Sequence, residues 1–393
     1  MMVMKKGRTA VYLLERVCGS IVVALFGCAM CSTAFADSAR ARSLGIPFDG
    51  TPGRFNAITD IEGVTVGYST LIEGDGEHAV RTGVTAILPR GPDTRNKPVF
   101  AGVFSLNGNG EMTGTHWIEE SGLLEGPVMI TNTHSVGIVR DAVIAWRIRQ
   151  GGADASGYWW SLPVVAETWD GDLNDINGFH VKPEHVFAAL ESAHGGAIAE
   201  GNVGGGTGMT CHEFKCGTGT SSRVVKIDGR EYRVGVLVQA NYGVRSELRI
   251  AGVAVGKVLR NDLQYPEAKD DGSIIIVIAT DAPLLPNQLK RMSRRASLGL
   301  ARNGSYSGNG SGDIFIAFST ANEASPVAIS SLTALGNDQL DPLFLATVRA
   351  VEESIINAMF AAEPMTGFEG HKAAAIDHLA LIKVLKEHKV IAR

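Results

Sequence analysis

The sequence lacks the motifs that mark several common enzyme classes. It contains no H-E-x-x-H pair and no G-x-S-x-G turn, which disfavours the common zinc peptidases and the α/β-hydrolases. The glycine-rich stretch 204–208 has neither the P-loop lysine nor the G-x-G-x-x-G context of a dinucleotide site. We interpret it as a tight loop whose backbone approaches other groups closely. The ten histidines form no triad or zinc pattern, and His134 fits a cap or a buried neutral residue as well as a base.

Basic residues and long apolar runs are also scarce. The 393 residues carry 36 Lys and Arg against 41 Asp and Glu and show no basic stripe, which argues against nucleic acid as a partner. Beyond the first 36 residues no stretch approaches 18 consecutive apolar residues, so we expect no membrane span there. A hydrophobic content of 45% is ordinary for a globular protein, and the length allows one large domain or two smaller ones.

Residues 1–36 have the pattern of a secretory signal. Lys5, Lys6 and Arg8 are basic, the stretch 17–30 is mostly apolar, and an A-x-A cleavage site ends at residue 36. An uncleaved anchor is the alternative. Removing a leader with four basic residues and one acidic residue leaves 32 Lys and Arg against 40 Asp and Glu, a net charge of −8. We therefore expect a periplasmic or secreted mature chain, 37–393.

Only two of the five cysteines lie outside this leader. In an oxidising compartment Cys211 and Cys216 could form a disulfide. With His212 and Glu213 between them they could instead suggest a metal, but four good ligands at a recognised spacing are missing. The sequence therefore predicts no metal and leaves the disulfide open.

The remaining chain alternates apolar strand patterns with amphipathic helix patterns. Such a mixture favours layered sheets covered by helices. Strand patterns occupy residues 61–68, 84–88, 99–106, 128–130, 162–168, 223–227, 231–238, 250–257, 273–280 and 314–318. Helix patterns occupy residues 136–146, 183–194, 286–302, 340–361 and 377–388.

The stretch 272–280 is the part around which the chemistry can be organised. Ser273 stands between a polar, linker-like segment, 259–271, and a run of β-branched residues. If the bond between Gly272 and Ser273 were cut, Ser273 would carry a hydroxyl nucleophile and a free α-amine that can help to move its proton. The alternative is an ordinary turn into a core strand, because Gly-Ser occurs four times in the chain.

Three further residues fit a serine hydrolase. Ser311 and Asp313 lie at i and i+2 where a loop enters a strand, so both side chains can face one site and relay a proton to or from Ser273. Asn241 follows a strand and offers a side-chain amide to an oxyanion, with a turn-forming role as its alternative.

A set of motifs, in this order, resembles the self-processing L-aminopeptidase/D-Ala-esterase/amidase and β-peptidyl aminopeptidase family. The resemblance covers nearly all of the mature chain, and the block around Ser273 is its most specific part. The motifs are PVVAET at 163–168, LNDING at 173–178, GGGTGM at 204–209, QANYG at 239–243, GS at 272–273 with ATDAP at 279–283, and GSGD at 310–313.

The resemblance implies a fold and a route of maturation. It implies an α+β fold, an αββα sandwich like that of N-terminal-nucleophile (Ntn) hydrolases with different strand connectivity. It implies self-cleavage between Gly272 and Ser273 into an α-chain, 37–272, and a β-chain, 273–393, of a single catalytic domain. It also implies a homo-oligomer, often a tetramer of such αβ units, and no metal or organic cofactor.

The resemblance also assigns roles to single residues. Ser273 matches the nucleophile, Ser311 the second catalytic serine and Asn241 the oxyanion-hole asparagine, while Glu167 matches the acidic residue that receives the substrate's free amino group. Two positions depart from the family pattern. Asp313 stands where some relatives have Glu. Trp169 stands where some have a Tyr hydroxyl, so it can only line the pocket or donate its indole N–H.

These assignments predict a serine aminopeptidase that forms an acyl-enzyme on Ser273. Its substrates would be short peptides, amides or esters with a free N-terminus, and we favour substrates that begin with a β-amino acid. An L-aminopeptidase with D-Ala esterase and amidase activity is the nearest alternative. A non-catalytic periplasmic binding protein is the alternative from another class, and an uncut, inactive chain would distinguish it.

Overall fold

The computed structural model describes residues 40–392 except 96, 152–159, 261–271 and 324–328. Every described residue belongs to one compact unit, Ser38–Arg393. The expected leader, 1–36, and most of the linker-like segment before Gly272 lie outside the described residues. No described helix has both the length and the apolar character that crossing a membrane requires.

Two sheets form the centre of this unit. The smaller has the order β1-β2-β5-β6, and its neighbours are antiparallel except for the parallel pair β5 and β6. The larger has the order β4-β3-β12-β11-β10-β9, and only β11 and β12 run parallel. The strands of the smaller sheet are β1 (Thr65–Glu73), β2 (Val80–Leu88), β5 (Val128–Asn132) and β6 (Val164–Thr168). Those of the larger are β3 (Val99–Ser105), β4 (Leu123–Leu124), β9 (Thr218–Ile227), β10 (Arg230–Asn241), β11 (Ser273–Thr280) and β12 (Ile314–Ser319).

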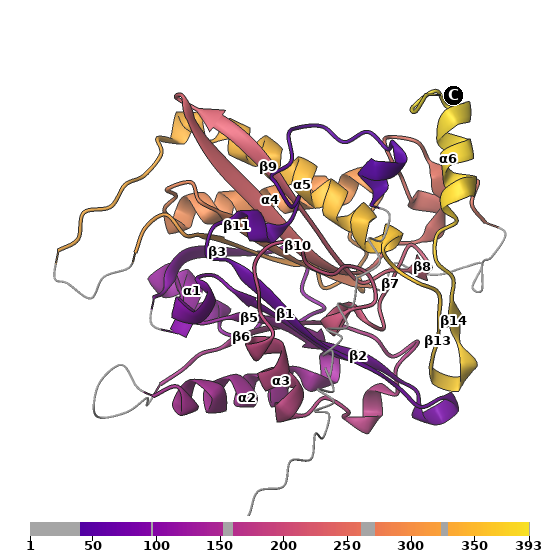
Figure 1. Cartoon of the computed structure of the whole chain (residues 1–393), viewed down its shortest axis with the longest axis horizontal. Coiled ribbons are helices and arrows are strands. Elements are labelled where there is room, and N and C mark those ends of the chain that lie inside the picture. The colour runs from indigo at the N-terminus through magenta and orange to yellow at the C-terminus, as the bar shows by residue number, and fades with distance from the viewer. Residues whose placement is uncertain (1–39, 96, 152–159, 261–271, 324–328, 393) are drawn as a thin grey trace, which may run out of the picture. The chain divides into compact units, whose positions relative to one another are not determined.

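Helices cover the outer faces of both sheets. Helices α2 and α3 pack on the smaller sheet, and α4 and α5 pack on the larger one, which gives the layer order αββα seen in Figure 1. The described helices are α1 (Thr115–Ser121), α2 (Val136–Arg149), α3 (Pro183–Glu191), α4 (Pro286–Arg302), α5 (Asp341–Phe360) and α6 (His378–Glu387). Two small hairpins add β7 (Thr210–Cys211) with β8 (Phe214–Lys215), and β13 (Met365–Thr366) with β14 (Lys372–Ala373). The αββα arrangement confirms the predicted fold class.

Strand β11 shows how the sequence builds these layers. All eight of its residues are buried, because one face meets the helices and the other meets the second sheet. Ile274, Ile276 and Ile278 pack toward α4 and α5, whereas Ile275 and Val277 lie in the apolar layer between the sheets. A strand buried on both faces reads as a continuous apolar run, as this one does. The period of two places Ser273 on the face of Ile275, toward the space between the sheets.

The structure corrects one predicted strand and adds an unpredicted helix. Residues 250–257 form a turn, closed by a bridge between Ile250 and Val253, and the 3₁₀ helix Val255–Lys257. Ile250 and Val255 are buried in the core beside the larger sheet, so the apolar pattern there reports burial of a folded loop rather than strand pairing. Helix α1, Thr115–Ser121, was not predicted because its seven residues include a single buried side chain.

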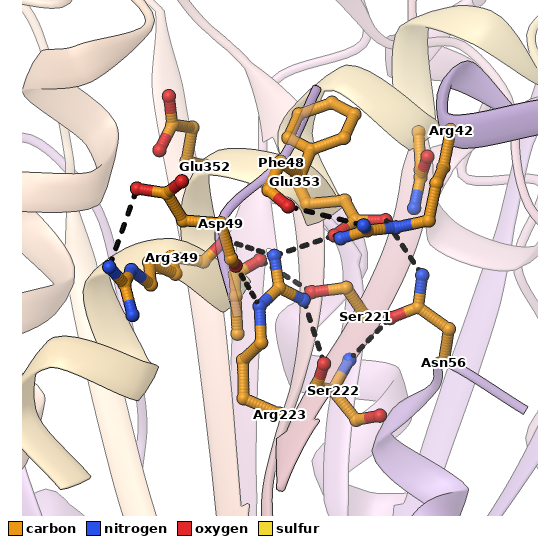
Figure 2. A network of polar contacts seen from close by, with 12 residues as sticks. Arg42, Phe48, Asp49, Asn56, Ser221, Ser222, Arg223, Arg349, Glu352 and Glu353 are labelled. Carbon is orange, nitrogen blue, oxygen red and sulfur yellow. Dashed lines mark hydrogen bonds and ion pairs between the residues drawn. The ribbon is translucent and has the colours of Figure 1, made fainter. Parts of the chain in front are cut away.

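An ion-pair network around the buried Glu353 ties the N-terminal arm, residues 40–60, to the larger sheet and to α5. Glu353, on α5, accepts hydrogen bonds from Arg42 and Asn56 of the arm and from Arg223 of β9 (Figure 2). The two guanidinium contacts are both 2.6 Å. Burial alone would raise the pKa of Glu353, but the hydrogen bond from Arg42 and the charge of Arg223 hold it below its ordinary value. The arm therefore anchors edge strand β9 through one carboxylate.

Candidate active site

Ser273 and Asn241 lie opposite each other at the ends of two neighbouring strands. In the antiparallel pair of β10 and β11, Asn241 is the register partner of Ser273. Directly opposed side chains share a face and stand about 5 Å apart at Cβ. Both are nearly buried, with exposed fractions of 7% for Asn241 and 6% for Ser273. The strand register therefore brings the candidate nucleophile and the candidate oxyanion donor to one point.

The Asn241 amide is held at both ends. Its Nδ2 donates to the carbonyl oxygen of Trp169 at 2.8 Å, and its Oδ1 accepts from the backbone N–H of Thr210 at 2.9 Å. These two contacts fix which end of the amide is the donor, and they leave the second Nδ2 hydrogen for another acceptor. Asn241 is thus prepared to donate to an oxygen that develops negative charge beside Ser273.

Strand β12 brings the second serine to the same place. β12 pairs in parallel with β11, and Ile275 opposite Ile314 is the first register pair. Ser273 and Gly312, each two positions earlier in its chain segment, therefore also lie close together. The backbone N–H of Gly312 donates to Ser273 Oγ at 3.2 Å. Next to it, Ser311 Oγ donates to Asp313 Oδ1 at 2.7 Å. The aspartate is fully buried and, although shorter than a glutamate, it reaches the serine hydroxyl.

The turn at 107–111 fixes this loop, a role that its composition alone did not reveal. Asn107 Oδ1 accepts from the N–H of Asp313 at 2.6 Å. Asn109 donates its side-chain amide to the carbonyl of Gly310 at 2.6 Å, and its backbone N–H to the carbonyl of Ser311. The sequence signal is the Asn-Gly repeat at 107–110, which by itself is typical of a turn. The turn hydrogen-bonds to a second Asn- and Gly-rich segment, 303–312.

Glu167 lies close to this group, at the end of β6. Only 4% of it is exposed, and its carboxylate accepts from the N–H of Glu111 at 3.0 Å and from the hydroxyl of Thr133. Gly110 lies between the Glu167 carboxylate and the Gly312 backbone. A Cβ added to Gly110 would stand 3.4 Å from Glu167 Oε1 and 3.0 Å from Gly312 Cα. Burial raises the pKa of Glu167, and these two hydrogen bonds oppose that rise.

Trp169 contributes through its backbone. Its carbonyl accepts from Asn241, while the residue as a whole remains 47% exposed. The following residue, Asp170, is buried and accepts from Asn174 at 3.1 Å, and burial raises the pKa of Asp170 to about 6. The sequence had suggested the indole as a pocket wall or donor. The structure adds that the Trp169 carbonyl orients the asparagine amide.

Gly272 packs against the strand that carries Asn241. A Cβ added to Gly272 would collide with the carbonyl oxygen of Asn241 and would stand 2.7 Å from Tyr242 Cα. Glycine is therefore required here because the backbone passes directly over its neighbour. The bond expected to be cut thus lies tightly packed beside the two candidate catalytic side chains.

The structure also shows where three other parts of the sequence analysis lie: the cysteine pair, the glycine-rich segment and His134. Cys211 and Cys216 form a disulfide, and within the part of the chain that the structure describes no three His, Cys, Asp or Glu side chains are grouped as metal ligands. The glycine-rich segment, with the 3₁₀ helix Gly204–Gly206, is fully buried, and a side chain on any of these glycines would collide with a strand or its side chains. It is the tight loop that we expected. His134 is exposed and stacks on Phe179 with ring centroids 5.9 Å apart.

Taken together, fold and site define a class, a hydrolase with a two-sheet sandwich and a serine at the start of a central strand. Ser273, Asn241 and the Ser311–Asp313 pair are the candidates for a nucleophile, an oxyanion donor and a proton relay, and they lie together. The signature of peptidase family S58 matches residues 56–373, most of the sequence, and the chain belongs to that family. The resemblance noted from the motifs is thereby confirmed.

Known relatives agree with this assignment. Over 390 residues the chain is 50% identical to the β-peptidyl aminopeptidase BapA of Sphingosinicella microcystinivorans, a match covering 93% of this chain and 96% of that protein. The solved L-aminopeptidase D-Ala-esterase/amidase of Ochrobactrum anthropi, described as a new variant among the Ntn hydrolase fold, is 48% identical with a TM-score of 0.85. That match covers 90% of this chain and 99% of the solved one. The solved structure of a Burkholderia β-aminopeptidase is 49% identical with a TM-score of 0.82. That match covers 88% of this chain and 98% of the solved one.

Proposed function

We propose that the protein is a self-activating serine aminopeptidase that removes N-terminal β-amino acids from short peptides and amides. The observation that carries this proposal is the meeting of Ser273, Asn241 and the Ser311–Asp313 pair at the ends of three neighbouring strands, beside the buried carboxylate of Glu167. The names of the relatives, two β-peptidyl aminopeptidases and a β-aminopeptidase, support the choice of substrate.

Maturation begins at the tightly packed bond between Gly272 and Ser273. Ser273 Oγ attacks the carbonyl carbon of Gly272, the C–N bond breaks, and the Ser273 nitrogen takes up a proton and becomes an α-amine. Water then hydrolyses the ester, which leaves a carboxylate on Gly272 and frees the hydroxyl. The products are an α-chain, 37–272, and a β-chain, 273–393, which stay folded together because β11 pairs with β10 along its whole length.

The same hydroxyl then attacks the substrate. Its proton passes to the α-amine of Ser273, whose reference pKa of roughly 8 leaves part of it neutral near pH 7. The carbonyl oxygen gains negative charge and accepts from Asn241 Nδ2. The Ser311–Asp313 pair relays the proton from the Ser273 α-ammonium to the departing amine. Water then attacks the ester carbonyl, gives a proton back to the α-amine system and releases the acyl group as a carboxylate, which restores the Ser273 hydroxyl.

Glu167 makes the enzyme an exopeptidase in this scheme. A carboxylate held a few ångströms from the Gly312 backbone pairs with the ammonium group of a substrate whose first carbonyl lies at Ser273. A peptide without a free N-terminus leaves that charge unpaired in a nearly buried place. The site thus selects the first residue of a chain.

An L-aminopeptidase with D-Ala esterase and amidase activity is the second candidate, because the O. anthropi enzyme is 48% identical. Rates of hydrolysis of β-alanyl and L-alanyl p-nitroanilides, measured side by side with a Ser273→Ala control, separate the two. A higher kcat/KM for the β-alanyl substrate supports our choice. A clear preference for L-alanine supports the second candidate, and full activity of the Ser273→Ala variant removes both.

The surroundings of the enzyme are part of the proposal. A leader at 1–36 would export the chain to the periplasm or beyond, where the Cys211–Cys216 disulfide would be stable. We further propose a homo-oligomer of αβ units. Mass spectrometry of the exported protein tests the first point through an N-terminus at residue 37, and light scattering tests the second through a mass that is a multiple of one αβ unit.

A further inference from the structure

We propose that the Cys211–Cys216 disulfide is a positioning element of the active site, acting through the backbone of Thr210 on the Asn241 amide. The inference rests on the proposed function, since it assigns a task to a feature next to the oxyanion donor. The feature is the disulfide hairpin, residues 209–216, which contains β7, β8 and the disulfide.

The hairpin is attached to the segment that begins with Asn241. Thr210 N–H donates to Asn241 Oδ1 at 2.9 Å, and His212 N–H donates to the carbonyl of Tyr242 at 2.7 Å. Arg245, only 2% exposed, donates in return to the carbonyls of His212 and Glu213, both at 2.7 Å. The end of β10 and the hairpin thus form one hydrogen-bonded unit, and the hairpin sets where the Thr210 N–H points.

The turn of the hairpin is unfavourable for its own sequence. Its two loop residues, His212 and Glu213, have φ of 50° and 61°. Two-residue turns with positive φ at both positions favour Asn-Gly or Gly-Gly, because other side chains are disfavoured there. Two strands of two residues each supply little pairing to offset this cost. A covalent link between the two arms offsets this cost.

The disulfide supplies that link at the foot of the hairpin. Cys211 and Cys216 are both fully buried, and beside them the N–H of Cys216 donates to the carbonyl of Met209 at 3.0 Å. Lys215 Nζ, also fully buried, donates to the carbonyls of Met209 and Cys216 at 2.7 and 2.6 Å. These hydrogen bonds join the same two arms of the hairpin that the disulfide links. Loss of the disulfide would let the arms separate and would release the Thr210 N–H from Asn241.

The test begins with the redox state and with two matched variants. Denatured, unreduced mature protein should show no alkylatable thiol. The Cys211→Ala/Cys216→Ala enzyme should have a kcat at least tenfold lower on β-alanyl p-nitroanilide, with KM within twofold, counted per processed β-chain. Val234→Ala is the control, because Val234 is buried in the same core cluster but lies seven residues before Asn241 on β10, opposite Thr280. Its kcat should stay within twofold of the wild-type value.

A combination with Asn241→Ala separates positioning from a general structural role. In that background the two cysteine substitutions should change kcat by less than twofold, because the amide that they position is gone. Should the cysteine variant not fold, Thr210→Pro removes the same N–H while keeping the disulfide, and it should show the same loss and the same lack of further effect.

Three results would overturn the inference: free thiols in the wild type, an unchanged kcat in both variants, or an equal loss with and without Asn241. Failure of the proposed function would look different. A correctly processed wild type that hydrolyses neither β-alanyl nor L-alanyl substrates would remove the function, and the inference with it. An active wild type together with a cysteine variant whose kcat is unchanged would remove only the role of the disulfide.

Discussion

Replacing Glu167 with Gln changes one charge beside the site and little else. The amide is close to the carboxylate in size and can still accept from the Glu111 N–H and contact the Thr133 hydroxyl. A hydrogen bond to a charged group contributes about 1.5–3 kcal/mol. Losing it from the substrate ammonium should therefore raise KM roughly 10- to 150-fold. Because the ammonium does not react, kcat should change only a few-fold.

Stability should move in the opposite direction from activity. Burial raises the pKa of Glu167, so its charged form costs free energy in the folded protein at neutral pH. An acid whose folded pKa is raised lowers stability above that pKa and has no effect below the unfolded value. The Gln variant should therefore melt at an equal or higher temperature at pH 7–8, and the advantage should vanish below about pH 4.

The assay combines initial rates on β-alanyl p-nitroanilide, inhibition by free β-alanine and melting curves at pH 4 and 8. The inhibition constant for β-alanine should rise by the same factor as KM, because both ligands present an ammonium group. In the wild type, kcat/KM should fall as the pH drops through the raised pKa of Glu167. An unchanged KM and inhibition constant, or a loss confined to kcat, would refute the assignment of Glu167 to the substrate amine.

Four further outcomes are expected. Gly272→Ala should slow self-cleavage at least tenfold on denaturing gels, because its Cβ would collide with a backbone carbonyl. Asn107→Ala should lower kcat about tenfold, since a hydrogen bond of about 1–1.5 kcal/mol that fixes Asp313 is lost. Burial lowers the pKa of Lys215 to about 7, so the wild type should gain stability relative to Lys215→Met as the pH rises from 7 to 10. Glu353→Gln should cost about 3–5 kcal/mol in urea unfolding at pH 7, because the buried Arg223 and the partly buried Arg42 lose the carboxylate that pairs with them. The difference from the wild type should shrink as the pH falls through the depressed carboxyl pKa.

Much of the layer architecture could be predicted because each layer leaves a periodic trace. The apolar run at 274–279 predicted a buried strand, and the amphipathic pattern at 286–302 predicted α4. Where the pattern had another cause the prediction was wrong, as at 250–257, where apolar residues are buried in a loop. Strand β9 begins at Thr218, five residues earlier than predicted, because its polar Thr and Ser side chains hydrogen-bond inside the protein.

The sequence placed the candidate site residues at strand ends, and the structure brings them together, but the residues that hold them in position were not predicted. Ser273, Ser311 and Asn241 stand at strand ends, where sequence alone suggests function. Asn107 and Thr210 act through contacts with residues far along the chain, and no local pattern encodes such pairs. The contact of the Trp169 carbonyl with Asn241 could not be predicted either, because every residue has a backbone carbonyl.

The most direct test of the account is the intact mass of the purified protein on denaturation, beside a Ser273→Ala variant. We predict two fragments in the wild type, the smaller beginning at Ser273, and one uncut chain in the variant. A single uncut chain in both, or cleavage in both, would contradict the claim that Ser273 is the nucleophile that frees its own amine.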